Sequence, residues 1–213
     1  MIKGDAVTNS PVVNLYFHVQ GRQVPADHGY ALYGAISRTF QALQNTSEEN
    51  WLHGADNVGL LPLRGSYQGS GKLLLNQQAR FGFRLPAALI PKALPLAGKR
   101  LDLNGDKLLV GVTTTEALIP VTTLYAHIIT TKNGEDETRF DAEIQRQLDA
   151  LDIKGKPARG PRRIITIKDK KVVGYSLLVS ELTAEESIRL QEQGLGGRRK
   201  MGGGIFVASK DSE

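Results

Sequence analysis

The 213-residue chain contains no cysteine, which excludes disulfide bonds and thiolate metal sites. No apolar run approaches the roughly 18 residues that a membrane-spanning helix needs, and the start, MIKGDAVTNS, lacks the apolar segment of a secretory signal. Only four histidines are present, and no two of them have metal-ligand spacing. We therefore expect a cytoplasmic protein with no membrane partner, no metal and no other cofactor.

Acidic and basic residues are unevenly distributed, although the formal net charge is only +5. Residues 154–171 hold eight Lys or Arg and one Asp, and residues 198–200 add three consecutive cations. Residues 135–152 hold seven acids and two bases. A single charged run is most often a solvated face, but two basic runs in one half of the chain favour a polyanionic partner.

Hydrophobic periodicity in the C-terminal half predicts the order β-α-β-β-α-β. The expected elements are a strand at 121–130, a helix at 138–151, a hairpin at 162–182, a helix at 183–194 and a strand at 203–208. Thr183, followed three residues later by Glu186, is typical of a capping box at a helix start, and Gly194 is expected to end that helix. This order is the ferredoxin-like unit.

The N-terminal half shows the same order less clearly. We expect a strand at 12–20, a helix at 26–43, paired strands at 72–76 and 79–85, a short helix or turn at 86–94, and closing strands at 99–112. The turn-rich segment 46–71 is expected to lie outside the core. The predicted class is therefore α+β, with two tandem ferredoxin-like (RRM-like) domains at 1–117 and 118–213 and a C-terminal glycine-rich loop.

The stretch GLGGRRKMGGG, residues 194–204, is the least usual segment of the chain. It fails the dinucleotide fingerprint because Arg199 stands at the third glycine position, and it precedes a strand instead of a helix. Glycines let a backbone approach a phosphate chain closely, while arginine can fork onto phosphate or guanine edges. The alternative is an exposed connection with no ligand.

His28 lies in PADHGYALYGAISR, where the first helix is expected to begin. A helix N-terminus disfavours a positive imidazole, so His28 is expected to be neutral and able to take a proton. Tyr30, Tyr33 and Ser37 follow within three turns. A lone histidine is more often structural than catalytic. His18 and His127 fall within expected strands, and the sequence does not place His53.

These features together resemble one known family. Two ferredoxin-like domains, a histidine at the first helix and the terminal GLGGRRKMGGGIF are similar to the CRISPR-associated repeat-RNA endoribonucleases of the RAMP superfamily. DHGYALYGAIS is similar to the stretch that carries the catalytic histidine in a myxobacterial and cyanobacterial-type branch. The resemblance implies metal-independent cleavage of CRISPR precursor RNA within the repeat, leaving 2′,3′-cyclic phosphate and 5′-hydroxyl ends. It also implies that the enzyme stays on the 3′ hairpin of the guide RNA, in a surveillance complex with other Cas proteins.

The resemblance assigns His28 as the proton carrier, and Tyr33 and Ser37 are the residues that we expect to complete the catalytic set. Tyr30 and Arg38 remain open for the second role, because no lysine lies between Lys3 and Lys72 to complete the Tyr-His-Lys set of some relatives. The expected RNA-binding residues are Arg38, Lys156, Arg159, Arg162, Arg163, Gly194, Gly196, Gly197, Arg198, Arg199, Lys200 and Gly202. The alternatives are a non-catalytic RAMP subunit and a general RRM-like RNA-binding module.

Overall fold

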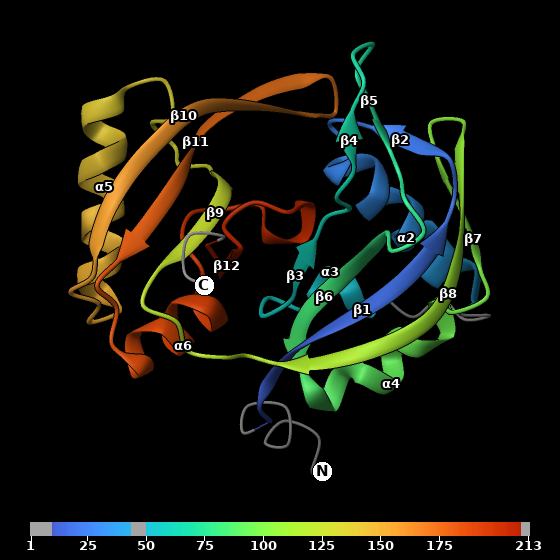
Figure 1. Ribbon diagram of the computed structural model, residues 1–213, viewed down its shortest axis with the longest axis horizontal. Coiled ribbons are helices and arrows are strands. Elements are labelled where there is room, and N and C mark those ends of the chain that lie inside the picture. The colour runs from blue at the N-terminus through green and yellow to red at the C-terminus, as the bar shows by residue number, and fades with distance from the viewer. Residues whose placement is uncertain (1–9, 44–49, 210–213) are drawn as a thin grey trace. The chain divides into compact units, whose positions relative to one another are not determined.

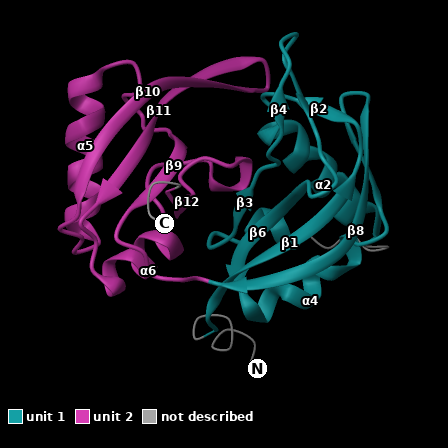
Figure 2. Ribbon diagram, viewed as in Figure 1, with its two compact units in different colours: residues 1–117 teal, residues 118–213 magenta. Residues whose placement is uncertain are grey.

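The computed structural model describes residues 10–43 and 50–209. The chain forms two compact units, unit 1 (Met1–Ala117) and unit 2 (Leu118–Glu213), drawn in different colours in Figure 2. Each unit has a hydrophobic core of its own.

Unit 1 is built on a five-stranded antiparallel sheet with the order β3-β6-β1-β8-β7. Its strands are β1 (Val12–Gln20), β3 (Gly59–Leu61), β6 (Arg80–Pro86), β7 (Arg100–Leu103) and β8 (Asp106–Ala117). Its helices are α2 (Gly29–Leu43), α3 (Trp51–Gly54) and α4 (Ile90–Ala93), the last flanked by the 3₁₀ turns Ala87–Leu89 and Leu94–Leu96. Strands β2 (Gln23–Pro25), β5 (Lys72–Leu74) and β4 (Ser66–Tyr67) form a separate small sheet. The succession β1-α2-β3-β6-α4-β8 is the ferredoxin-like order.

Two sequence-based expectations for unit 1 are wrong. The segment 46–71 was expected to lie outside the core, yet Val58, Leu60 and Leu63 are at most 3% exposed. The strand that pairs with β6 is β3, whereas Lys72–Leu74 pairs with β2 and β4. The physical reason is that β3 has only three residues, all buried, so it shows neither the length nor the alternation by which a strand is recognised.

The core of unit 1 fixes α3 beside α2. Helix α2 buries the stripe Leu32, Ala35, Ile36 and Phe40, as its 3.6-residue periodicity predicts. The Trp51 ring of α3 packs edge-on against Phe40, with centroids 5.4 Å apart. Leu43, the last residue of α2, is 38% exposed.

Unit 2 repeats the architecture in its simplest form. Its elements are β9 (Leu124–Ile129), α5 (Glu137–Ala150), β10 (Lys156–Ile167), β11 (Lys170–Ser180), α6 (Ala184–Gln193), the 3₁₀ turn Arg199–Met201 and β12 (Phe206–Ala208). The sheet order is β10-β11-β9-β12 (Figure 1), the same order that β3-β6-β1-β8 gives in unit 1. The predicted class, α+β with tandem ferredoxin-like domains, is confirmed.

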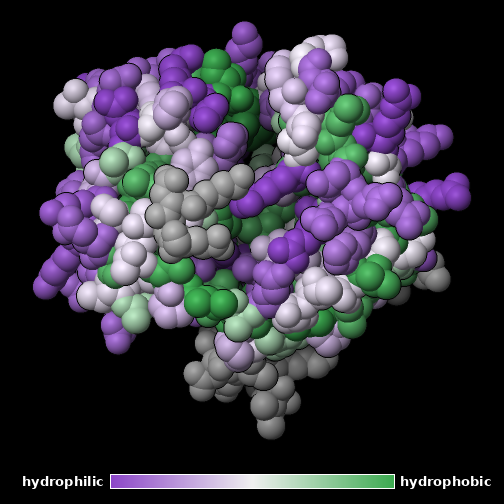
Figure 3. Space-filling view, viewed as in Figure 1, coloured by the Kyte–Doolittle hydropathy of each residue, from purple (hydrophilic) through white to green (hydrophobic). Residues whose placement is uncertain are grey.

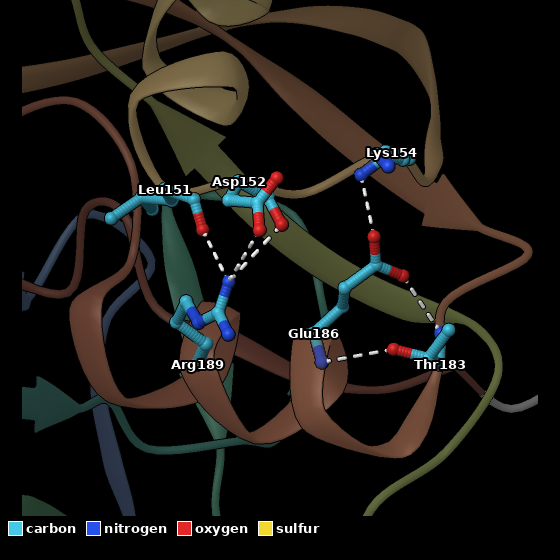
Figure 4. Close-up of polar contacts among 6 residues, drawn as sticks. All are labelled: Leu151, Asp152, Lys154, Thr183, Glu186 and Arg189. Carbon is cyan, nitrogen blue, oxygen red and sulfur yellow. Dashed lines mark hydrogen bonds and ion pairs between the residues drawn. The ribbon is translucent and has the colours of Figure 1, made fainter.

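A capping box and two further hydrogen bonds hold α6 in place (Figure 4). The Thr183 Oγ1 accepts the backbone N–H of Glu186, and the Glu186 carboxylate accepts that of Thr183 in return. The other Glu186 oxygen accepts the Lys154 N–H at 2.6 Å, while the Arg189 Nη1 donates to the Leu151 carbonyl at 2.7 Å. Helix α6 is therefore tied to the segment between α5 and β10, and it leads directly into the glycine-rich loop.

Replacing Glu186 by Gln is expected to lower the free energy of unfolding by about 1 to 3 kcal/mol at neutral pH, because the two backbone N–H groups are accepted by different carboxylate oxygens and Gln replaces one of these oxygens by an NH₂ donor. The backbone hydrogen bond from Lys154, followed by that from Thr183, lowers the pKa of Glu186. A lowered folded pKa gives stability that is present above the unfolded pKa and is lost as pH falls through the folded one. Denaturant unfolding at pH 7 and pH 3 should show the difference between wild type and E186Q shrinking at low pH. The exposed neighbour variant E185Q is the control, and a pH-independent difference would contradict this account.

Candidate functional site

Three polar side chains from α2 and α3 meet at the surface of unit 1. The Ser37 Oγ lies 2.6 Å from Nε2 of His53, and the ring centroids of Tyr33 and His53 are 5.9 Å apart. Tyr33 and Ser37 are four residues apart on α2 and therefore share one helix face. His53 is exposed and the other two are half-buried. We call this group the Tyr33–Ser37–His53 cluster.

Asn50 joins α3 to the cluster. Its Nδ2 donates to the Ser37 carbonyl at 2.9 Å and to the Ser37 Oγ at 3.0 Å, while its Oδ1 accepts the N–H of Leu52 as the N-cap of α3. Because the Ser37 oxygen accepts from Asn50, its own proton is available for Nε2 of His53. In the tautomer that leaves Nε2 unprotonated, Ser37 donates this hydrogen bond and His53 is a proton acceptor.

Tyr33 remains a proton donor at neutral pH. Burial raises the pKa of its hydroxyl, and the hydrogen bond with Ser37 opposes that rise. The cluster therefore combines a protonated phenol, a hydroxyl and an imidazole nitrogen that can accept a proton. These are the groups that general acid–base chemistry uses.

His28 lies in a different environment from His53. It is 4% exposed, and its Nδ1 lies 3.0 Å from the Pro25 carbonyl oxygen. A carbonyl can only accept, so Nδ1 carries the proton and Nε2 holds the lone pair. Burial lowers the pKa of His28, although the backbone hydrogen bonds oppose the shift. Among the described residues Nε2 has no hydrogen-bond partner, and the protein covers it.

Among the described residues His28 makes no hydrogen bond or ring contact with Tyr33 or Ser37. Helix α2 begins at Gly29, so His28 directly precedes the helix. Ser37 lies nine residues further on, about 13.5 Å along the axis at 1.5 Å per residue. We treat His28 and His53 as alternative candidates for the proton carrier.

The glycine-rich loop, residues 194–204, is held against the sheet of unit 2 by backbone hydrogen bonds. Gly197 donates to the Thr130 carbonyl at 3.0 Å, and Gly204 donates to the Ile128 carbonyl at 2.9 Å. A side chain at Gly194 would collide with the Gly204 carbonyl, and one at Gly196 with that of Thr130. The φ angles are positive at Gly194, Gly196, Gly202 and Gly204. The glycines thus allow a compact, hydrogen-bonded loop.

The three cations of the loop have different surroundings. Arg198 is exposed, whereas Arg199 folds back and donates from Nη2 to the Glu192 carbonyl at 2.7 Å. Burial lowers the pKa of the Arg199 guanidinium. Lys200 is half-buried and has an interaction of its own. Arg198 is consequently the loop cation most open to an external anion.

Most cations proposed on β10 are already paired with carboxylates. Lys156 contacts Glu181 at 2.7 Å, and Arg162 contacts Glu135 at 3.1 Å. Arg159 contacts two carboxylates of α5, Glu137 and Asp141, at 2.8 and 2.9 Å. An RNA phosphate would have to compete with these acids. Arg163 is half-buried, and its Nε has no hydrogen-bond partner among the described residues. Arg38 lies on α2 in unit 1 and is exposed. Its Nη2 is 3.5 Å from the Asp102 carbonyl oxygen.

The rest of the described surface adds no metal-ligand group. Within residues 10–43 and 50–209, three His, Asp or Glu side chains nowhere lie close enough to hold a metal ion together. In the same residues no helix has the length and apolar character needed to span a bilayer. On the face drawn in Figure 3, hydrophilic residues predominate and hydrophobic ones are scattered among them.

Comparison with known proteins shows the class to which these features belong. The tandem ferredoxin-like units and the glycine-rich loop define a RAMP-type protein, and the family model described as "Cas6 Crispr" matches residues 13–211. The CRISPR-associated endonuclease Cas6 of Myxococcus xanthus (strain DK1622) is 40% identical over 195 residues, which are 92% of this chain and 80% of the relative. The chain therefore belongs to the Cas6 family, and the resemblance inferred from its sequence is confirmed.

Solved structures agree on the fold. A structure described as CRISPR associated protein Cas6 has a TM-score of 0.68 at 13% identity, covering 93% of this chain and 100% of its own. A Cas6-related protein from Pyrococcus furiosus has a TM-score of 0.64 at 11% identity, covering 94% of this chain and 99% of its own. At these identities the likeness establishes the architecture of the chain.

Sequence reasoning missed His53 and Asn50. His53 lies in the turn-rich segment that was expected to be an excursion, and the helix α3 that carries it has only four residues. The one local signal was Asn50 as a possible N-cap immediately before Trp51. The contact with Ser37 spans 16 residues, and periodicity cannot reveal a contact of that kind.

Proposed function

We propose that this chain is an endoribonuclease that cuts CRISPR precursor RNA within the repeat without using a metal ion. The observation that supports this most strongly is the Tyr33–Ser37–His53 cluster at the surface of a Cas6 family member. The Myxococcus relative is itself named an endonuclease. Unit 1 performs the cleavage, and unit 2 binds the repeat.

RNA supplies its own nucleophile for this reaction. The 2′-hydroxyl attacks the adjacent phosphate and expels the 5′-oxygen, which takes a proton from water, so that the products are a 2′,3′-cyclic phosphate and a 5′-hydroxyl. His53 takes the proton of the 2′-hydroxyl at Nε2, where Ser37 now donates. Tyr33 holds the 2′-hydroxyl in line with the leaving oxygen, and alignment alone contributes much of the rate. Arg38 is close enough along α2 to neutralise charge on the phosphorane.

His28 is the competing proton carrier that the sequence favours. Its neutral imidazole with a lone pair on Nε2 suits a general base. Because the protein covers that nitrogen, His28 can reach RNA only if the segments packed around it move. Tyr33, Ser37 and the exposed His53 need no such rearrangement, and we therefore assign cleavage to the cluster.

In unit 2, Arg198 and the glycine backbone of the loop contact the RNA phosphates. Lys200 adds positive charge. The shape of the loop depends on its glycines, namely Gly194, Gly196, Gly197 and Gly202. The cations of β10 (Lys156, Arg159, Arg162 and Arg163) extend this surface to the repeat hairpin. Arg199 supports the loop through Glu192. After cleavage the protein stays on the 3′ hairpin as a cytoplasmic subunit of a surveillance complex with other Cas proteins.

Arg198→Ala is expected to weaken repeat binding and to reduce the log–log salt slope by about one unit, because one phosphate contact is lost. Arg199→Ala is expected to lower the free energy of unfolding by about 1 kcal/mol, because the hydrogen bond to the Glu192 carbonyl disappears. Filter binding across a salt series and thermal melts measure the two effects. Arg146→Ala is the matched control, since Arg146 is exposed and pairs with Glu143 on α5. An unchanged slope for Arg198→Ala would show that Arg198 makes no phosphate contact.

The proposed function is tested by incubating the protein with end-labelled repeat RNA and with an unrelated hairpin RNA of equal length. We expect one cut in the repeat, none in the control hairpin, and product that stays bound in a native gel. Binding without cleavage would instead identify a non-catalytic RAMP subunit, and equal binding of both RNAs would identify a general RNA-binding module.

A further inference from the structure

A hollow of about 480 Å³ lies against α3 in unit 1. Its lining includes Trp51, Ala55, Asp56, Asn57, Leu89 and Lys92, and we call it the α3 hollow. Its volume is within the range of small-molecule sites, which run from roughly 300 to 1,000 Å³. The cleavage chemistry proposed above uses none of these side chains.

The α3 hollow and the Tyr33–Ser37–His53 cluster share one short helix. Trp51 and Gly54 line the hollow, and His53 stands between them in the four-residue helix α3. Positions along a helix are separated by only about 1.5 Å of rise. A nucleotide whose phosphate lies at His53 therefore has a base, its own or its neighbour's, within reach of the hollow.

The chemistry of the lining matches a nucleobase better than a phosphate. Trp51 lines the hollow and is half-buried, and its indole N–H is covered by protein. Leu89 is a further apolar wall. An aromatic face is the usual platform for an unpaired RNA base. Asp56 would repel a phosphate, and with Lys92 it brings the formal charge of the lining to zero.

The polar groups at the rim are complementary to one base in particular. On its Watson–Crick edge guanine offers two neighbouring N–H donors and one carbonyl acceptor. A carboxylate such as that of Asp56 can accept both donors, an ammonium such as that of Lys92 can donate to the carbonyl, and the Asn57 amide can add either kind of bond. Adenine lacks the carbonyl, and uracil lacks the second donor.

We propose that the α3 hollow binds an unpaired guanine of the nucleotide next to the scissile phosphate, and so selects the position of the cut. This rests on the proposed cleavage function. Trp51 stacks on the base, and Asp56 and Lys92 read its edge. The hollow acts as a specificity site and takes no part in proton transfer.

The test uses repeat RNAs in which the nucleotide on either side of the cut is varied through all four bases. Single-turnover cleavage by wild type should favour guanine at one of the two positions by about tenfold, the range of a good base-edge contact. Asp56→Asn should flatten that preference by slowing cleavage of the guanine-containing RNA to the rate of the disfavoured RNAs. Asp149→Asn, an exposed carboxylate of α5 in unit 2, is the matched control. Cleavage indifferent to both flanking bases would overturn the guanine site and leave the nuclease assignment intact.

A second measurement does not depend on cleavage. Trp51 is the only tryptophan of the chain, so intrinsic fluorescence reports on the hollow alone. Titration with GMP should change the emission saturably, with weaker responses to AMP, CMP and UMP, and Asp56→Asn should abolish the difference between GMP and AMP. An equal response to inorganic phosphate, or no saturable response to any nucleotide, would overturn the proposal even in a protein that cuts RNA.

Discussion

His53→Ala is expected to slow cleavage of the repeat RNA by on the order of 10²-fold or more, the usual contribution of general acid–base catalysis. The substitution removes the nitrogen that Ser37 contacts at 2.6 Å but no cationic phosphate contact, so RNA affinity should stay nearly unchanged. Single-turnover cleavage at saturating enzyme measures the rate, and filter binding measures the affinity. Tyr33→Phe is expected to give a smaller loss, because the phenol aligns the 2′-hydroxyl and moves no proton.

His28→Ala is the decisive comparison. The side chain is buried and its Nδ1 donates to the Pro25 carbonyl, so its loss should lower the melting temperature. The cleavage rate of the folded fraction should remain close to that of wild type. The opposite pattern, with His28→Ala inactive and His53→Ala fully active, would transfer the proton-carrier role to His28. It would also show that the segments over its Nε2 open when RNA binds.

The sequence predicted unit 2 well because its elements are regular and its signals are local. Phe140, Ile144 and Leu148 recur at helical spacing and are all buried in α5. Thr183 and Glu186 lie within one helical turn of each other, so the capping box could be read directly. Features that depend on residues close together in the sequence could therefore be predicted from the sequence.

Features that depend on distant parts of the chain were not recoverable. The basic run of β10 predicted an open phosphate-binding surface, yet Arg159 is paired with Glu137 and Asp141, which α5 presents to the strand. The pairing depends on the packing of α5 against the sheet, and composition cannot show that. The acidic run and the basic run of this half of the chain thus partly neutralise each other.

The candidate site was predicted only in part for the same reason. The sequence indicated Tyr33 and Ser37, because they share a face of a helix that was predicted correctly. The identity of the nearby histidine depended on where Trp51 anchors α3, through its contact with Phe40. His28 was the candidate because its position relative to the helix start could be read from the sequence, whereas the place of His53 required the tertiary structure.

A repeat RNA with a single 2′-deoxy nucleotide immediately before the cut is expected to resist cleavage completely, while wild-type RNA is cut at an undiminished rate in EDTA. The first result follows because the 2′-hydroxyl is the nucleophile, and its removal leaves nothing for His53 to deprotonate. The second follows because the RNA supplies the nucleophile, and the Tyr33–Ser37–His53 cluster supplies the proton acceptor and the hydroxyl groups that orient the 2′-hydroxyl.

The deoxy RNA should still bind with the affinity of the normal repeat, since its phosphates and hairpin are intact, and a 2′-deoxy nucleotide placed several positions away is the matched control. Product ends distinguish the mechanisms independently: the upstream fragment should carry a cyclic phosphate, so that phosphatase cannot remove its terminal phosphate until mild acid has opened the ring. Cleavage of the deoxy RNA, or loss of cleavage in EDTA with recovery on adding Mg²⁺, would mean that water attacks the phosphate and that a metal ion activates it. In that case the cluster on α2 and α3 would bind the RNA without performing the chemistry.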